Sequence, residues 1–304
     1  MVTESRPAEL ARSTTPSVDL PSVAAVVVAV VLWASAFVAI RDIGPALSAA
    51  PMALLRLAVA AVTLTILVGL RHRGGSRVPR SRVPWLLIIG YAVLWLAGYT
   101  VALNAAERHV DAGTAALLVN LAPLLVAIGA AALLREALPP ALLVGVLVSL
   151  AGVAAIALGA TGHRDGIGVA LCLLAAVLYA AGVLIQKAAL RHVDALTAIW
   201  LGCVIATVVL LPWTPQLISE LSAAPARIIA EGVYLGVFPT AIGFTAWSYA
   251  LRRTDAGRLT TSSYAVPAVS VLLSWLLLGE IPTAWALIGG TICLVGVAIS
   301  RRRP

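Results

Sequence analysis

Ten apolar stretches, each long enough to cross a membrane as a helix, follow one another along this chain and are separated by short connectors rich in charge, proline and glycine. A helix needs about 20 residues to span the roughly 30 Å hydrocarbon core of a bilayer. The expected limits are 21–40, 49–70, 84–104, 112–134, 140–160, 166–187, 195–214, 229–250, 257–279 and 283–300. A soluble domain could not cover its surface with 61% hydrophobic and 11% charged residues. We therefore predict an all-α integral membrane protein with ten transmembrane helices, preceded by a disordered polar tail over residues 1–20.

The basic residues are divided unequally between the two sets of connectors. If the N-terminus lies inside, 16 of the 21 lysine and arginine residues fall on the cytoplasmic side. Since short cytoplasmic loops carry the excess of positive charge in membrane proteins, we expect a multi-pass protein of the cytoplasmic membrane with both termini in the cytoplasm. The basic residues are scattered over connectors that face lipid headgroups and cytosol, so the formal charge of +8 does not indicate a nucleic-acid partner.

The second half of the chain repeats features of the first half at a constant offset of 144 residues. Asp111-Ala112-Gly113, Pro123 and Glu136 recur as Asp255-Ala256-Gly257, Pro267 and Glu280. The offset corresponds to five predicted helices, so residues 21–160 and 166–300 are expected to form two five-helix repeats. An odd number of crossings sends the second repeat into the membrane from the other side, so the repeats should be inverted. Inverted repeats favour alternating access to one shared cavity, although channels and structural proteins also arise by duplication.

Several short motifs accompany the repeat. They are the segment Trp33-Ala-Ser-Ala-Phe37-Val-Ala-Ile-Arg41, the triplets Leu55-Arg56-Leu57 and Ala102-Leu103-Asn104, and the two proline- and glutamate-containing spans. Together with the ten-span topology, they resemble the EamA-type permeases of the drug/metabolite transporter superfamily, over residues 21–300. The chain departs from the family pattern at Arg135-Glu136, where Gly-Glu is usual, and it has no second-half arginine matching Arg56. The resemblance implies an exporter of amino acids or related metabolites.

Pro123 and Pro267 lie near the middle of their predicted helices, where each removes a backbone hydrogen bond and is expected to kink the helix. Asn120 stands three residues before Pro123, and Tyr264, with Ser263 adjacent, stands three residues before Pro267. Polar groups beside a kink at mid-membrane depth are tolerated where they face protein or water. We expect the two kinks to face each other across a central substrate cavity. Alternatively, Asn120 only satisfies a neighbouring helix.

Aromatic residues are a second set of candidate substrate contacts. Three of them recur every four residues through the interior of the third predicted helix, and the others lie on different helices. Such a set could line a cavity and stack on apolar or zwitterionic ligands, although each member is also compatible with core packing. The set comprises Trp33, Tyr91, Trp95, Tyr99, Tyr179 and Trp247, with Phe37 and Phe244.

Three charged residues are further candidates. Arg56 is the only basic residue in the interior of a predicted helix, and it either snorkels to the interface or binds a carboxylate of the substrate or the protein. Glu136 and Glu280 follow the helices that carry the two prolines. Each is expected to accept hydrogen bonds from the free amides that open the next helix, and secondarily to act as a gate residue.

The sequence contains no catalytic constellation and no metal-ligand spacing, so no enzyme activity, metal or cofactor is expected. No nucleotide-binding motif is present, so ATP is not expected to drive the protein directly. The predicted function is a secondary transporter that exports an amino acid or similar metabolite as a facilitator or exchanger, because every acidic residue lies in the N-terminal tail, in a connector or at the end of a predicted helix, and none lies in a helix interior. One chain should suffice for the pathway. The alternatives are a permease for sugar derivatives, nucleobases or drug-like cations, an importer, or a membrane-embedded enzyme or receptor.

Overall fold

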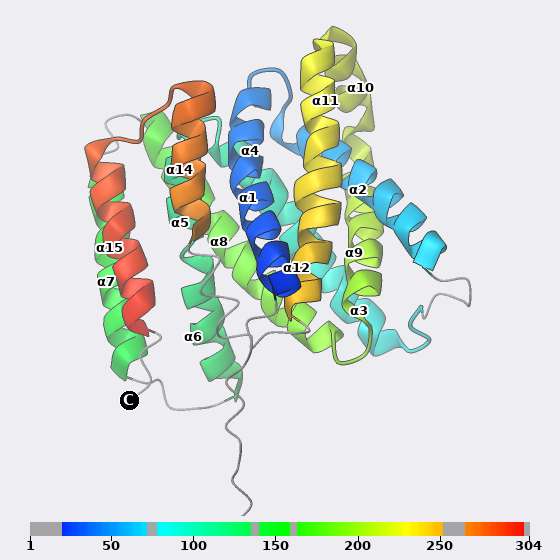
Figure 1. Ribbon diagram of the computed structural model, residues 1–304, viewed down its shortest axis with the longest axis horizontal. Helices are drawn as coiled ribbons and strands as arrows, with labels where there is room; N and C mark the ends of the chain where they lie inside the picture. The colour runs from blue at the N-terminus through cyan, green and yellow to red at the C-terminus, as the bar shows by residue number, and fades with distance from the viewer. Residues whose placement is uncertain (1–19, 72–77, 135–139, 159–162, 252–264, 301–304) are drawn as a thin grey trace, which may run out of the picture.

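The computed structural model (Figure 1) describes residues 20–71, 78–134, 140–158, 163–251 and 265–300. All regular secondary structure in these ranges is helical. Six described stretches are long and apolar enough to cross a membrane: Leu20–Ile43, Ala49–Leu70, Arg82–Ala106, Gly166–Ala189, Ala195–Ala223 and Ala226–Trp247. Four shorter apolar helices, Ala112–Val126, Leu143–Ile156, Ala265–Leu278 and Ala284–Ile299, coincide with the remaining predicted spans. The prediction of an all-helical membrane protein is confirmed.

The helices follow the predicted order closely. The first half of the chain contains α1 (Leu20–Ile43), α2 (Ala49–Arg71), α3 (Arg82–Tyr91), η1 (Ala92–Tyr99), α4 (Thr100–Ala106), α5 (Ala112–Val119), α6 (Ala122–Leu134) and α7 (Pro140–Leu158). The second half contains α8 (His163–Ala189), α9 (Ala195–Leu210), η2 (Leu211–Trp213), α10 (Thr214–Ala223), α11 (Ala226–Leu235), η3 (Gly236–Ile242), α12 (Gly243–Leu251), α14 (Ala265–Leu278) and α15 (Ala284–Ser300). The described start of α1 and the end of α15 lie on the same side of the molecule, at the bottom of Figure 1.

Two of the long stretches are interrupted by a wider helix at equivalent positions. The third predicted span changes from α-helix to π-helix at Ala92, and the eighth predicted span does so at Gly236, 144 residues later. Pro239 lies inside the second π-helical segment, where its missing N–H disturbs the regular hydrogen-bond ladder. Short π-helical segments inside α-helices are frequent at functional sites, and both segments lie beside the cavity described below.

The fourth predicted span is not one kinked helix. It divides into α5 and α6, and Asn120 caps the C-terminus of α5. Pro123 is the second residue of α6, where a proline costs little because the first N–H groups of a helix have no intrahelical partner. Pro267 is likewise the third residue of α14. The predicted mid-helix kink is therefore a helix break at Asn120, and the proline starts the next helix.

The helices α7 and α15 form a closely packed pair, visible at the left of Figure 1. A Cβ atom added to Gly152 would meet the carbonyl oxygen of Gly289 at 2.5 Å, and one added to Gly289 would meet that of Gly152 at 2.5 Å. Glycine at both positions lets the two backbones approach, as is common between membrane helices. Ser149 and Cys293, which are separated by the repeat offset of 144 residues, are hydrogen-bonded in the same contact.

Polar contacts join the two halves at the end of α1 opposite Leu20. The main-chain N–H and the hydroxyl of Ser48 donate to the Glu220 carboxylate over 2.8 and 2.6 Å. Arg227 pairs with Asp42, and the hydroxyls of Ser35 and Tyr234 lie 2.6 Å apart, deeper along α1. These contacts tie α1 and the connector that follows it to α10 and α11.

Candidate functional site

A cavity with a volume of about 110 Å³ lies between the two halves of the chain. Its lining comes from α1, α2, η1, α4, the α5–α6 break, α8, α12 and α14. The lining residues are Trp33, Ala36, Phe37, Arg56, Trp95, Tyr99, Leu103, Ala116, Val119, Asn120, Ala122, Pro123, Tyr179, Phe244 and Val266. Seven of the ten predicted spans therefore meet around one space, and most of its wall is apolar.

Aromatic rings form a continuous wall of this cavity. The ring of Trp33 lies 5.4 Å from that of Phe244, measured between centroids, and Phe244 lies 5.2 Å from Trp95. Trp95 meets Tyr179 edge-on at 5.2 Å, and Tyr179 lies 5.7 Å from Tyr99. These separations are typical of favourable tilted and edge-to-face aromatic contacts. The wall joins α1 and η1 of the first half to α8 and α12 of the second half.

Arg56 provides a fixed positive charge at the cavity. Its side chain is buried, at 8% exposure, and its Nε donates to the hydroxyl of Thr240 over 2.9 Å. The Thr240 hydroxyl donates in turn to the carbonyl of Leu235 over 2.8 Å, which fixes the orientation of the guanidinium. Among the described residues, no carboxylate forms an ion pair with Arg56. The predicted alternative in which Arg56 snorkels to the interface is therefore not the arrangement in the structure.

Asn120 contributes the main polar group of the α5–α6 break. Its Oδ1 atom is buried and has no hydrogen-bond partner. The break also brings Val119, Ala122 and Pro123 to the cavity, because the chain changes direction between two short helices. A buried carbonyl oxygen without a partner is costly unless a donor reaches it, so the position suits a donor from a ligand or from water.

The structure gathers most of the predicted site residues, but not all of them. Trp33, Arg56, Trp95, Tyr99, Asn120, Pro123 and Tyr179 line the cavity. Trp247 lies behind the wall, with its ring 4.9 Å from Trp33. Tyr91 does not line the cavity: it is fully buried and donates to the carbonyl of Ala198 in α9. Pro267 is buried, and its neighbour Val266 lines the cavity instead. Ser263, Tyr264 and Glu136 lie outside the described residues.

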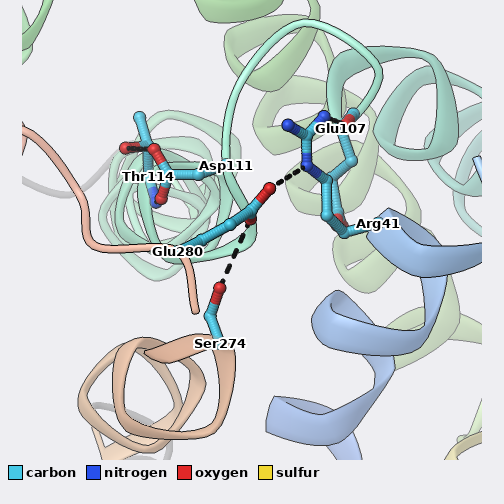
Figure 2. Close-up of polar contacts among 6 residues, drawn as sticks. All are labelled: Arg41, Glu107, Asp111, Thr114, Ser274 and Glu280. Carbon is cyan, nitrogen blue, oxygen red and sulfur yellow. Dashed lines mark hydrogen bonds and ion pairs between the residues drawn. The ribbon is translucent and has the colours of Figure 1, made fainter. Parts of the chain in front are cut away.

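Glu280 does not have the predicted capping role. Its Oε1 accepts from Arg41 Nε over 2.8 Å, and its Oε2 accepts from the Ser274 hydroxyl over 3.4 Å (Figure 2). The N-terminus of α15 is capped by Thr283, whose hydroxyl accepts from the Ala286 N–H over 3.1 Å. The carboxylate is drawn away from the helix because a charged guanidinium is a stronger partner than a main-chain amide.

Two important residues were not singled out by the sequence. Thr240, the partner of Arg56, lies directly after Pro239 in η3, and only the proline marks that position in the sequence. Glu107 follows α4 and is 1% exposed, and in the sequence it is one of several charged residues of a connector. Neither residue belongs to a recognisable motif.

The chemistry of the cavity is that of a binding site. It offers one cationic group, one unpartnered carbonyl acceptor and several aromatic faces. In the described part of the chain, no group of three or more metal-ligating side chains could hold a metal ion. Such a cavity suits a small molecule with an anionic group and an apolar body.

Sequence comparison places the chain among transporters. Residues 20–158 and 166–302 each match the family model described as "EamA-like transporter family". A protein of Streptantibioticus cattleyicolor named "Probable terminal-alkyne amino-acid exporter" is 37% identical over 284 residues, covering 92% of this chain and 93% of that protein. The uncharacterized transporter YdfC of Bacillus subtilis is 32% identical over 275 residues, covering 88% and 87% of the two chains.

A solved crystal structure shares the fold. It superimposes with a TM-score of 0.63 at 21% sequence identity and covers 92% of this chain and 96% of its own. At this identity the likeness concerns the fold alone. The two matched halves correspond to the helices before and after residue 160.

Proposed function

Because the chain belongs to the EamA-like transporter family and is a membrane transporter of small molecules, we propose that it exports amino acids with apolar side chains across the cytoplasmic membrane. The observation that carries the proposal is Arg56, a buried guanidinium on the cavity with no carboxylate partner among the described residues. A buried charge requires a counter-charge, and the carboxylate of an amino acid would supply it. The name of the Streptantibioticus cattleyicolor relative supports an amino-acid substrate.

The rest of the cavity fits the remaining parts of an amino acid. The Asn120 Oδ1 atom is an acceptor without a partner, and an α-ammonium group is a strong donor. The aromatic wall from Trp33 to Tyr99 would receive an apolar or unsaturated side chain through its ring faces and edges. Tyr264, Ser263 and Pro267, which the repeat relates to the Asn120 region, remain proposed members of the site.

We further propose that the two halves are inverted five-helix repeats that open the cavity to each side in turn. The equivalent π-helical segments at Ala92 and Gly236 and the pairing of Ser149 with Cys293 support this relation. The bias of basic residues supports a topology with both termini in the cytoplasm. All lining residues come from one chain, so a monomer suffices for the pathway.

The proposal is tested by transport into liposomes that contain the purified protein. A panel of labelled amino acids should show uptake of apolar members, and Arg56→Gln should lower the rate at limiting substrate about 10- to 100-fold, as expected for the loss of a charge-assisted hydrogen bond. Lys187→Gln is the matched control, because this lysine is exposed at the end of α8 and does not line the cavity. Equal transport by wild type and Arg56→Gln at matched protein levels would refute the assigned site.

A further inference from the structure

Glu107 is buried in an unusual state. The residue follows α4 directly, is 1% exposed, and has two carboxyl oxygens that are buried without any hydrogen-bond partner. An ionised carboxylate without hydrogen bonds is much costlier to bury than a protonated one. Burial accordingly raises the pKa of Glu107 well above its ordinary value. The arrangement therefore favours the protonated form of the carboxyl group in this conformation.

The Arg41 guanidinium forms no ion pair with the Glu107 carboxyl group. The Arg41 guanidinium is directed to other groups: its Nη1 donates to the main-chain carbonyl of Glu107 over 2.7 Å, and its Nε donates to Glu280 over 2.8 Å. Figure 2 shows the dashed contact from Arg41 to Glu280, with no contact drawn to the Glu107 carboxyl group. The positive charge of Arg41 is thus balanced by the Glu280 carboxylate. The Glu107 carboxyl group lies beside this ion pair without a partner of its own.

Charged and titratable side chains act on Glu107 from every side. They are Arg41 of α1, Arg56 of α2, Tyr99 of η1, Asp111 before α5, Cys172 of α8 and Glu280 after α14. The two arginines favour the ionised form of Glu107, whereas burial and the two other carboxylates oppose it, and burial is the largest effect. Both carboxylate oxygens of Asp111 already accept hydrogen bonds from Thr114, one from its main-chain N–H over 2.8 Å and one from its hydroxyl over 2.6 Å. His109 lies two residues after Glu107 and has a buried Nδ1 atom without a partner.

The cluster lies one helical turn beyond the cavity. Leu103 lines the cavity from α4, and Glu107 follows it by four residues; Phe37 lines the cavity from α1, and Arg41 follows it by four residues. The Arg41–Glu280 ion pair joins the first half of the chain to the second half at this end. The pair must break before these two elements can separate, so the cluster has the position of a gate.

We propose that Glu107 is the proton-binding residue of an external gate: it takes up a proton when the gate closes by pairing Arg41 with Glu280, and it releases the proton when the gate opens to water. The assignment to the external side rests on the topology given under the proposed function. The proton comes from bulk water outside and returns to it.

The direction of the pH effect follows from linkage. Once the gate opens, water solvates Glu107, and its pKa falls toward the ordinary glutamate value of about 4.3. Between that value and the raised value of the closed state, closing consumes one proton, so the ratio of closed to open gates falls up to about tenfold for each unit that pH rises. Below the ordinary value both states are protonated, and pH has no effect on the ratio.

The test measures access to the cavity from outside and needs no substrate. Ala116→Cys places a thiol on the cavity lining, and Ser222→Cys places one on exposed α10 at the same end of the molecule. The unmodified chain is the blank, because its cysteines Cys172, Cys203 and Cys293 are buried. A membrane-impermeant maleimide is added outside right-side-out vesicles at pH 5.5 to 8, and the ratio of the two labelling rates cancels the intrinsic pH dependence of the thiol reaction.

We expect this ratio to rise with external pH by up to about tenfold per unit, and to become independent of pH in Glu107→Gln. Asp111→Asn and His109→Gln are matched controls that should retain the dependence. A ratio that is flat in the wild type, or a dependence that persists in Glu107→Gln or vanishes in His109→Gln, would overturn the proposal. Failure of Ser222→Cys to react from outside would refute the topology separately from the proton site.

A second measurement observes the proton directly and does not depend on gating. The infrared spectrum of the purified protein at neutral pH should contain a carboxylic-acid C=O band that disappears in Glu107→Gln and remains in Asp111→Asn. Identical bands in the wild type and Glu107→Gln would show that Glu107 is ionised, and the proposal would fail.

Discussion

Ser149 and Cys293 occupy equivalent positions in the two halves of the chain and exchange hydrogen bonds: the Ser149 hydroxyl donates to the Cys293 carbonyl over 3.1 Å, and the Cys293 thiol donates to the Ser149 carbonyl over 3.3 Å. The contact is therefore reciprocal: each side chain donates to the main-chain carbonyl of the other residue. Two equivalent positions can contact each other reciprocally only near an axis that exchanges them. The contact is a local sign of two-fold symmetry between α7 and α15.

This packing predicts a matched response to substitution on the two helices. Gly152→Ala and Gly289→Ala each place a Cβ atom 2.5 Å from a carbonyl oxygen of the facing helix, so the helices must separate, at a cost of about 1–3 kcal/mol. Thermal denaturation in detergent should show similar losses for both variants. Gly69→Ala is the control, because nothing lies within 4 Å of its added Cβ; a loss as large in this variant would contradict the packing argument.

Gly182→Ala should disturb the aromatic wall without altering a ring. A Cβ atom on Gly182 of α8 would collide with the Cβ of Trp95, so the tryptophan must move relative to Tyr179. We expect apparent substrate affinity to fall by about tenfold, consistent with the sensitivity of positioned groups to small displacements, while expression is preserved. Gly90→Ala meets only Ile185 at 3.6 Å and should transport normally, and equal transport by both variants would argue against the wall as a substrate surface.

Asn120→Leu should impair transport by removing the acceptor at the α5–α6 break. Its Oδ1 has no partner in the protein, so the loss of a hydrogen bond to a charged ammonium should raise KM by about 10- to 100-fold. Tyr264→Leu is expected to behave similarly on the repeat argument. Gln216→Leu, on the exposed face of α10, should leave KM unchanged. A normal KM in Asn120→Leu at matched abundance would remove the residue from the site.

Glu107→Gln should change how stability depends on pH. Because burial raises the pKa of Glu107 in the folded protein, its favourable contribution is fully present below the ordinary pKa of about 4.3 and is lost as pH rises toward the folded-state value. Glutamine does not titrate, so the variant should gain stability relative to wild type as pH increases from 5 to 8, by up to about 1.4 kcal/mol per unit. Parallel pH profiles of Tm would contradict the raised pKa.

The spans were predictable because a bilayer leaves the backbone few alternatives. Continuous apolar runs bounded by charge must become helices in lipid, and the repeat of Asp111, Pro123 and Glu136 revealed the division into halves. The breaks within the spans were not predictable. The π-helical segment at Ala92 has no sequence marker of its own, and of the three aromatic residues predicted on this span only Trp95 and Tyr99 line the cavity.

The candidate site was predictable where the residue type alone was informative. Arg56 stood out because an arginine inside an apolar run is costly, and Asn120 stood out beside Pro123. The role of Glu280 was not predictable, because it depends on the partner that the fold brings next to the carboxylate. That partner, Arg41, is 239 residues away in the chain. Glu107 was overlooked because connectors are normally solvated, whereas Glu107 is buried in the structure. The sequence argument looked for proton-coupling residues only in the interiors of the spans. It therefore missed Glu107, a carboxyl group that is buried at the end of a span.

The central claim is that Arg56 binds the carboxylate of an amino acid in the cavity, and calorimetric titration of the purified protein tests it most directly. An apolar amino acid and its uncharged carboxamide should be titrated into wild type and Arg56→Gln. The account predicts that wild type binds the free acid at least about tenfold more tightly than the amide, and that Arg56→Gln loses this preference, because the charge-assisted contact is absent. Equal affinity of wild type for the acid and the amide would contradict the account.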